Sequence, residues 1–146
     1  MFNQLILLIC SMVCTSLADD SIFDAIENEC IDKLGLGFYE NLIVLESGYL
    51  KEDDEDMRAF FACVWKEKGF QRENGSVNFN SIYEIIVSER KSGSSEFGSA
   101  YVAIQAIANC EDIEEENHGH TVIMVYNCLN EKVLEYNEKF RNKFIR

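Results

Sequence analysis

The chain has 146 residues, which suits one domain of ordinary size. It carries 26 Asp and Glu residues against 13 Lys and Arg residues, a formal net charge of −13. This balance argues against binding to nucleic acid phosphates or to anionic membranes, and it keeps a concentrated protein soluble. The chain has no proline and is rich in helix-forming apolar residues and glutamate, so we expect an all-α fold.

The N-terminal segment has the pattern of a secretory signal peptide. An apolar run over residues 5–13 is too short to span a bilayer, and Ser16 and Ala18 supply the small residues of a signal-peptidase site. Asp19 and Asp20 follow at once. We expect cleavage after Ala18, so that 1–18 is the signal peptide and 19–146 is one secreted, extracellular helical domain.

Cleavage would also remove Cys10 and Cys14. The cysteines that remain form an even set: Cys30, Cys63, Cys110 and Cys128. In a secreted chain such a set favours two disulfides, and no pair among them has the C-x-x-C spacing of a metal site.

Apolar spacing predicts helices along the first half of the mature chain. The first runs over residues 21–34, capped by Asp20-Ser21 and ended by Gly35, with its inward side chains being Ile22, Ile26, Cys30 and Ile31. A short helix is expected at 38–46. The third, at 54–68, has a broad apolar stripe made of Met57, Phe60, Phe61, Val64 and Trp65. A stop at Gly69 and a polar turn over 73–76 follow.

Three further helices are expected in the second half. The fourth, at 79–90, would bury Phe79, Ile82, Tyr83, Ile85 and Ile86. The fifth, at 96–110, follows a loop whose serines can cap it, and its stripe consists of Phe97, Ala100, Tyr101, Ile104, Ile107 and Ala108. The last, at 120–136, presents Val122, Val125, Tyr126, Leu129 and Val133, before a basic and aromatic tail from Lys139.

The sequence predicts no enzyme, no cofactor and no metal site. His118 and His120 follow an acidic segment, and the cysteines are all used in disulfides, so neither Ser-His-Asp nor Cys-His chemistry is credible. A calcium loop with Gly75 as its sixth residue would have Phe70 and Arg72 where oxygen ligands are required. The triplet at 74–76 is an N-glycosylation sequon on an exposed turn.

With these residues in view, the chain resembles the insect odorant-binding proteins of the pheromone and general odorant-binding family. Its four cysteines fit the family's first, third, fourth and sixth, and the second and fifth would fall at Ala59 and Gly119. Those two are disulfide partners in the family, so their joint loss orphans no thiol, as in the four-cysteine subgroup called Minus-C. The segments WKEKGF (65–70) and ENGSVN (73–78) are similar to the family's turn after its third cysteine.

The resemblance implies a compact bundle of about six helices around an apolar cavity, stapled by disulfides Cys30–Cys63 and Cys110–Cys128. It implies a secreted carrier that takes small hydrophobic odorants or pheromones through aqueous lymph to a chemosensory membrane receptor. Its partners would be that ligand and receptor, without nucleic acid or stable membrane association. Loss of the third bridge predicts that the third and last helices separate more easily than in six-cysteine relatives.

The candidate ligand-binding residues come from two sources. The resemblance carries over Phe61, Trp65, Phe70, Val77, Val122 and Leu129, and the helical stripes alone add Val64, Ile82, Ile86, Ile104 and Val125. Tyr101 and Tyr126 are candidates for a hydroxyl that orients the ligand. Each of these side chains could equally be an ordinary core residue.

Two alternatives to odorant transport stay open. The first is a carrier of lipids, hormones or gland pheromones outside olfaction, and the second is a disulfide-stapled helical effector with a filled core and an acidic acting surface. The acidic segment 111–117 beside His118 and His120 also prompts the hypothesis that ligand is released at lower pH.

Overall fold

The structure is a computed structural model, and it describes residues 23–36, 49–90 and 95–144. Within these ranges the chain is all-α, as predicted, and the only extended pairing is an isolated antiparallel bridge between Gln71 and Val77. The helices are α2 (Ala25–Leu34), α3 (Glu55–Glu67), α4 (Phe79–Arg90), α5 (Glu96–Cys110) and α6 (His118–Phe144). The expected signal peptide 1–18 and the expected helix 38–46 lie outside the described residues.

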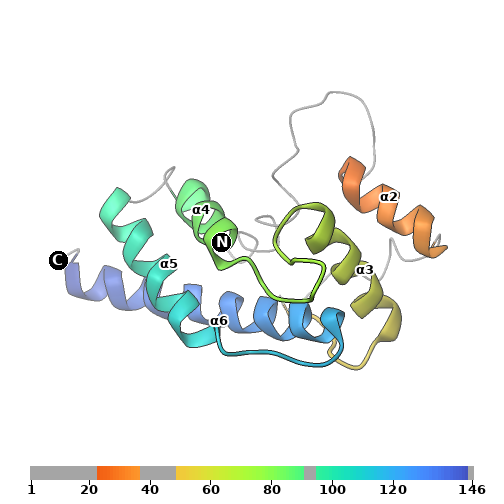
Figure 1. Ribbon diagram of the computed structural model, residues 1–146. Helices are drawn as coiled ribbons and strands as arrows, with labels where there is room; N and C mark the ends of the chain where they lie inside the picture. Colours follow the sequence, from red (N-terminus) through yellow and green to blue (C-terminus); the bar gives the residue numbers. More distant parts are fainter. Residues whose placement is uncertain (1–22, 37–48, 91–94, 145–146) are drawn as a thin grey trace.

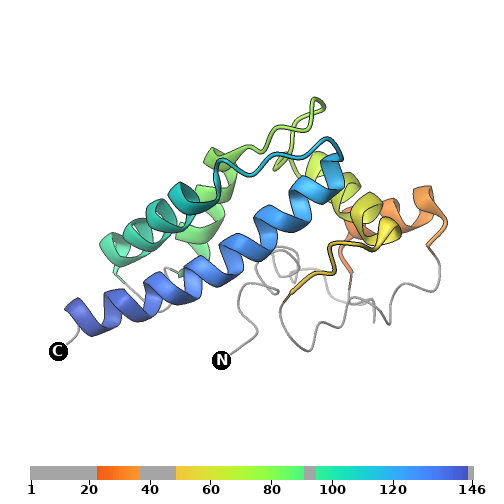
Figure 2. The same cartoon turned by 90° about the horizontal axis from the view of Figure 1, so that it is seen from below.

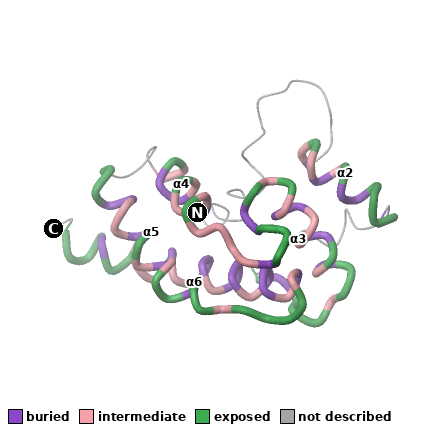
Figure 3. Tube along the Cα trace, viewed as in Figure 1, coloured by how far each residue is buried: buried purple, intermediate pink, exposed green. Residues whose placement is uncertain are grey.

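Helix α6 is the long element on which the others are arranged (Figures 1 and 2). Helix α3 packs near the N-terminal end of α6, and α5 packs along its C-terminal part. Helix α2 in turn packs on α3, and α4 packs on α5. Figure 3 shows buried positions recurring along α3 and α6, so these two helices contribute much of the core. No described helix is long and apolar enough to cross a membrane.

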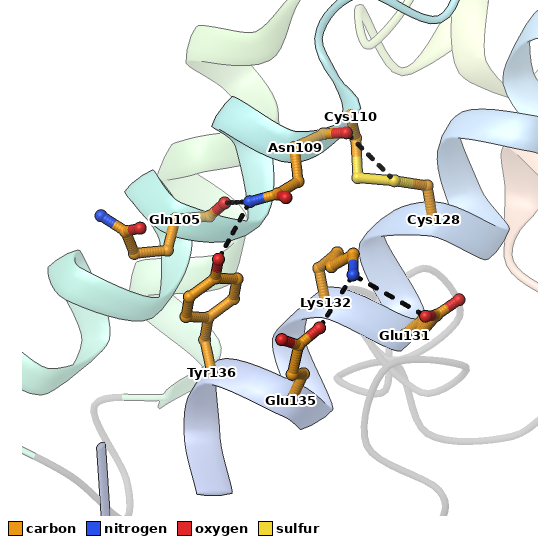
Figure 4. The surroundings of a disulfide bond; sticks show 8 residues. All are labelled: Gln105, Asn109, Cys110, Cys128, Glu131, Lys132, Glu135 and Tyr136. Atoms are coloured by element: carbon orange, nitrogen blue, oxygen red, sulfur yellow. Dashed lines mark hydrogen bonds and ion pairs between the residues drawn. A yellow bond between two sulfur atoms is a disulfide. The ribbon is translucent and has the colours of Figure 1, made fainter. Parts of the chain in front are cut away.

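Two disulfides fasten this arrangement, with the pairing that the resemblance implied. Cys30–Cys63 joins α2 to α3 with an S–S distance of 2.04 Å, and Cys110–Cys128 joins α5 to α6 at 2.00 Å. Beside the second disulfide, the side-chain amide of Asn109 donates a hydrogen bond to the Tyr136 hydroxyl at 3.2 Å (Figure 4). The α5–α6 pair is therefore tied covalently and by a polar contact about two turns further along α6.

The start of the first described helix differs from the prediction. Helix α2 begins at Ala25 rather than at residue 21, because Asp24 is its N-cap. The Asp24 carboxylate accepts from the Glu27 amide at 2.8 Å, and the Glu27 carboxylate accepts from the Asp24 amide at 3.0 Å. This reciprocal capping box satisfies two amides that the helix itself cannot pair. The predicted stop is confirmed, since Gly35 ends the helix with φ of 68°.

The middle helices match their predicted limits closely. Asp54 caps α3, Gly69 follows its end with φ of 78°, and Ser95 caps α5 by accepting from the Gly98 amide. The whole predicted stripe of α3 is buried. In α4, Ile82 and Ile86 are buried as expected, whereas Phe79, Tyr83 and Ile85 are only half-buried and Val87 takes a place in the core.

Helix α6 is longer than the predicted 120–136, because the tail continues it to Phe144. Lys139 pairs with Glu135 one turn earlier, which supports the helix on its exposed side. On the opposite side Phe140 is buried against α5 at Gly98, where a Cβ would stand 2.8 Å from the phenyl ring. The tail is thus held by packing on α5 as well as by its own helix propensity.

The predicted inward face of α5 is wrong in part: Tyr101 and Ile107 are half-buried and pack against the core, but three other members of the stripe face outward. Phe97 and Ile104 are 65% and 54% exposed, and Ala108 is exposed as well. The buried residues are instead small or medium in size: Gly98, Ser99, Val102, Ala103, Ala106 and Cys110. Cys110 must face α6 to form its disulfide, and side chains in phase with it are therefore the ones that face the core. Their small size allows α5 to approach α6 closely.

Candidate ligand-binding site

Most of the candidate ligand-binding residues lie in one contiguous cluster of buried side chains. We call these buried candidates the apolar wall. They come from α3, the following turn, α4 and α6: Phe61, Val64, Trp65, Phe70, Ile82, Ile86, Val122, Val125, Tyr126 and Leu129. Helical spacing explains the grouping, because the members on α3 and on α6 recur every three or four residues and so share one face.

Aromatic contacts join parts of the apolar wall that are far apart in sequence. The ring of Phe61 on α3 lies 6.2 Å from that of Tyr126 on α6, measured between centroids. At the end of α3, the indole of Trp65 meets Phe70 edge to face, with centroids 6.0 Å apart and planes at 84°. The Trp65 carbonyl also accepts from the amides of Phe70 and Gln71, which brings the turn back across the end of its own helix.

The remaining candidates lie elsewhere or are less buried. Ile104 points away from the core, so the stripe that placed it inward is the wrong face of α5. Tyr101 is half-buried and belongs to a separate aromatic group with Tyr136, Phe140 and Phe144 near the end of α6. Val77 is half-buried at the bridge to Gln71. Of the two tyrosines proposed to orient a ligand, Tyr126 is a member of the apolar wall, and Tyr101 packs at the border of the core.

Sequence reasoning also missed several members of the same core. Ile123 on α6 and Val102, Ala103 and Ala106 on α5 are all 0% exposed. The phase of Cys110 carried a signal for the α5 residues, because they stand four, seven and eight positions before it. The larger side chains on the other face of α5 obscured that signal.

A polar framework fixes the turn after α3 against the start of α6. The Gln71 side-chain amide donates to the Gly75 carbonyl at 2.8 Å and to the His118 carbonyl at 2.9 Å. A Cβ on Gly75, whose φ is 88°, would stand 2.3 Å from the His118 imidazole. The ammonium of Lys66 on α3 lies 3.0 Å from Nδ1 of that ring, which therefore accepts the hydrogen bond. His120, by contrast, lies 4.0 Å from carboxylates of Glu52 and Glu115.

A buried charged cluster holds α2 at the end of α3. The Lys68 ammonium lies 2.5 Å from Asp24 and 3.2 Å from Glu27, and all three side chains are nearly inaccessible. Burial raises the pKa of Glu27, and the positive charge of Lys68 and the hydrogen bond from the Asp24 amide oppose that rise. The cluster therefore supports the α2–α3 pair at the same end that the disulfide Cys30–Cys63 ties.

A second polar contact closes the segment before α3 onto α6. The buried side chain of Asn127 accepts from the Leu50 amide at 2.8 Å and donates to the Leu50 carbonyl at 2.9 Å. These residues are 77 positions apart. One side-chain amide pairs with both the N–H and the C=O of Leu50. Leu50 can therefore be 3% exposed without leaving a buried backbone group unpaired.

Comparison with known proteins gives one match. A scan against protein-family models matches residues 15–132 to the PBP/GOBP family. Searches of the curated proteins and of the solved structures returned no match to this chain.

Proposed function

The chain belongs to the PBP/GOBP family, whose members are binding and carrier proteins rather than enzymes, and we propose that it is a secreted carrier of a small hydrophobic molecule. The ligand is an odorant or a pheromone, and it is held among the residues of the apolar wall. The protein takes it through aqueous lymph to a chemosensory membrane receptor.

The observation that supports this proposal best is the composition of the apolar wall. Its residues come from three helices and a turn, and all are aliphatic or aromatic. Such surfaces bind a ligand through burial of apolar area, at about 25 cal/mol per Å². A ligand that buries roughly 300 Å² would gain about 7 kcal/mol before the costs of ordering, which suits micromolar binding.

Secretion is part of the proposal. Disulfides such as Cys30–Cys63 and Cys110–Cys128 form and persist in oxidising compartments, which is where the expected signal peptide 1–18 would direct the chain. Expression of the full chain in insect cells tests this directly. The proposal requires protein in the medium that starts at Asp19, as read by N-terminal sequencing.

Carriage is tested by titrating that secreted protein with the fluorescent probe N-phenyl-1-naphthylamine and competing it with fatty and aromatic volatiles. The carrier function predicts saturable micromolar binding, with displacement by some compounds and not by others. A well-folded helical protein without saturable binding would instead have a filled core. In that case the effector alternative would replace the carrier function.

A further inference from the structure

Trp65 carries a buried hydrogen-bond donor that finds no acceptor in the part of the chain that the structure describes. The side chain is 0% exposed, and its Nε1 has no hydrogen-bond partner among the described residues. Leaving a buried polar group unpaired is unfavourable, and a buried tryptophan usually finds a partner for this N–H. The unpaired N–H of Trp65 is an exception to this behaviour and therefore requires an explanation.

The surroundings of the indole do not supply that acceptor. Its ring partner is Phe70, an apolar side chain without a lone pair. The nearby carbonyl of Trp65 itself is already used by the amides of Phe70 and Gln71. Among the described residues, Oε1 of the neighbouring Gln71 is a buried acceptor that is also unpaired, so the two side chains do not satisfy each other.

Trp65 is at the same time a member of the apolar wall, on the face of α3 that carries Phe61 and Val64. A donor in that position can select among ligands that are otherwise equally apolar. A ligand oxygen placed against Nε1 would form the missing hydrogen bond in a low-dielectric site, where such a bond is strong and where its absence is costly.

We propose that Trp65 Nε1–H is the polar anchor of the ligand site, and that the ligand is an apolar molecule bearing an acceptor oxygen: a ketone, aldehyde, ester, ether or alcohol. This inference rests on the proposed carrier function. The anchor would make the site prefer oxygen-bearing ligands over hydrocarbons, because a saturated hydrocarbon has no acceptor for the indole N–H. Burial of apolar area alone does not give this preference.

The first test is spectroscopic and needs no variant. The chain has a single tryptophan, so protein labelled with ¹⁵N-tryptophan gives one indole N–H resonance. The full chain is expressed in insect cells, purified from the medium and titrated with 2-heptanone or with n-octane, which has the same number of non-hydrogen atoms. We expect the indole proton to move downfield with the ketone and to show no such shift with the hydrocarbon. Equal shifts with both ligands, or none with either, would overturn the anchor.

The second test uses Trp65→Phe, which keeps an aromatic ring and removes the N–H. We expect this variant to weaken binding of 2-heptanone about 3- to 10-fold more than binding of n-octane, the loss of one neutral hydrogen bond. Phe61→Leu, on the same helix face, is the matched control and should affect both ligands equally. If Trp65→Phe also affects both equally, the anchor is wrong and the carrier function stands. If the wild type shows no saturable binding of the fluorescent probe, the carrier function fails and the anchor with it.

Discussion

Gly119 of α6 lies directly against the backbone of Arg58 of α3. A Cβ at Gly119 would stand 2.1 Å from the Arg58 carbonyl oxygen, far inside van der Waals contact. The resemblance places the second cysteine of six-cysteine relatives at Ala59, the residue after Arg58, and the fifth at Gly119. At Gly119 the missing disulfide is accompanied by a close backbone contact that only glycine allows.

Gly119→Ala should therefore destabilise the protein. The added methyl group has to move α6 away from the α3 backbone, and overpacking of this kind costs about 1–3 kcal/mol. Urea denaturation followed by circular dichroism measures the change. Ala59→Ser, at the exposed neighbouring position on α3, is the control and should stay within about 0.5 kcal/mol of the wild type.

The same contact predicts the outcome of restoring the lost bridge. A cysteine at Gly119 would place its Cβ inside the Arg58 carbonyl, so Ala59→Cys with Gly119→Cys should lower stability even when the disulfide forms. The free energies of unfolding of the oxidised double variant and of the wild type are to be compared. A more stable double variant would contradict the importance of this contact.

The expectation that α3 and α6 separate more easily than in six-cysteine relatives stays a prediction. Amide hydrogen exchange of the two helices would measure it.

Asn127→Ala should loosen the segment before α3. Loss of the amide leaves the N–H and C=O of the buried Leu50 without their partner, at a cost of about 1–3 kcal/mol. Amide hydrogen exchange should show loss of protection at Leu50 together with the drop in stability. Asn109→Ala, which removes an exposed amide from α5, is the matched control and should leave Leu50 protected. Unchanged exchange at Leu50 in Asn127→Ala would refute the contact.

Lys68→Met should destabilise the protein in a pH-dependent way. Removal of the ammonium leaves Asp24 and Glu27 as uncompensated buried carboxylates, at a cost of about 3–5 kcal/mol near neutral pH. Burial already raises the pKa of Glu27 above its ordinary value of 4.5, and loss of Lys68 raises it further. An acid whose pKa is raised by folding stabilises the folded state when protonated, and that stability is lost as pH rises through the folded-state pKa.

The loss in the free energy of unfolding of Lys68→Met, relative to the wild type, should therefore be smaller at pH 5 than at pH 7.5. Denaturant unfolding of both proteins at both pH values measures it. Lys33→Met removes an exposed lysine of α2 that pairs with Glu29 and Glu67, and it should leave the free energy of unfolding nearly unchanged at either pH. A loss in the free energy of unfolding of Lys68→Met that grows as the pH falls would contradict this explanation.

Release of the ligand at lower pH stays a hypothesis. His118 and His120 lie in the first turn of α6, and Nδ1 of His118 accepts a hydrogen bond from the Lys66 ammonium of α3. The affinity of the fluorescent probe, measured at pH 7.5 and at pH 5, tests the hypothesis, and equal affinities in the wild type would end it.

The parts of the fold that sequence predicts well are those fixed by local chemistry. Asp54, Ser95 and Gly69 mark helix limits through capping and through a left-handed residue, and the stripe of α3 is uninterrupted from Met57 to Trp65. The family resemblance supplied the disulfide partners, which four cysteines alone leave open.

The wrong predictions concern features that depend on contacts between residues far apart in the sequence. The face of α5 is chosen by its disulfide and by close packing on α6, so the larger Phe97 and Ile104 are left outside and the smaller Val102 and Ala106 go inside. The extension of α6 depends on Phe140 meeting Gly98, a contact between segments that sequence does not place together. The absence of a described hydrogen-bond partner for the Trp65 N–H could not be predicted, because it depends on where the surrounding acceptors lie in three dimensions.

The most direct measurement of the central claim compares the dissociation constants of N-phenyl-1-naphthylamine for the wild type, Val125→Phe and Ile104→Phe. Val125 is a fully buried member of the apolar wall on α6, whereas Ile104 was a candidate from the same sequence pattern and is 54% exposed. If ligand binds within the wall, Val125→Phe should weaken probe binding by about fivefold or more, as expected for overpacking of about 1–3 kcal/mol at the site, and Ile104→Phe should bind like the wild type. Equal affinities for all three proteins, with folding verified by circular dichroism, would contradict a ligand site in the apolar wall.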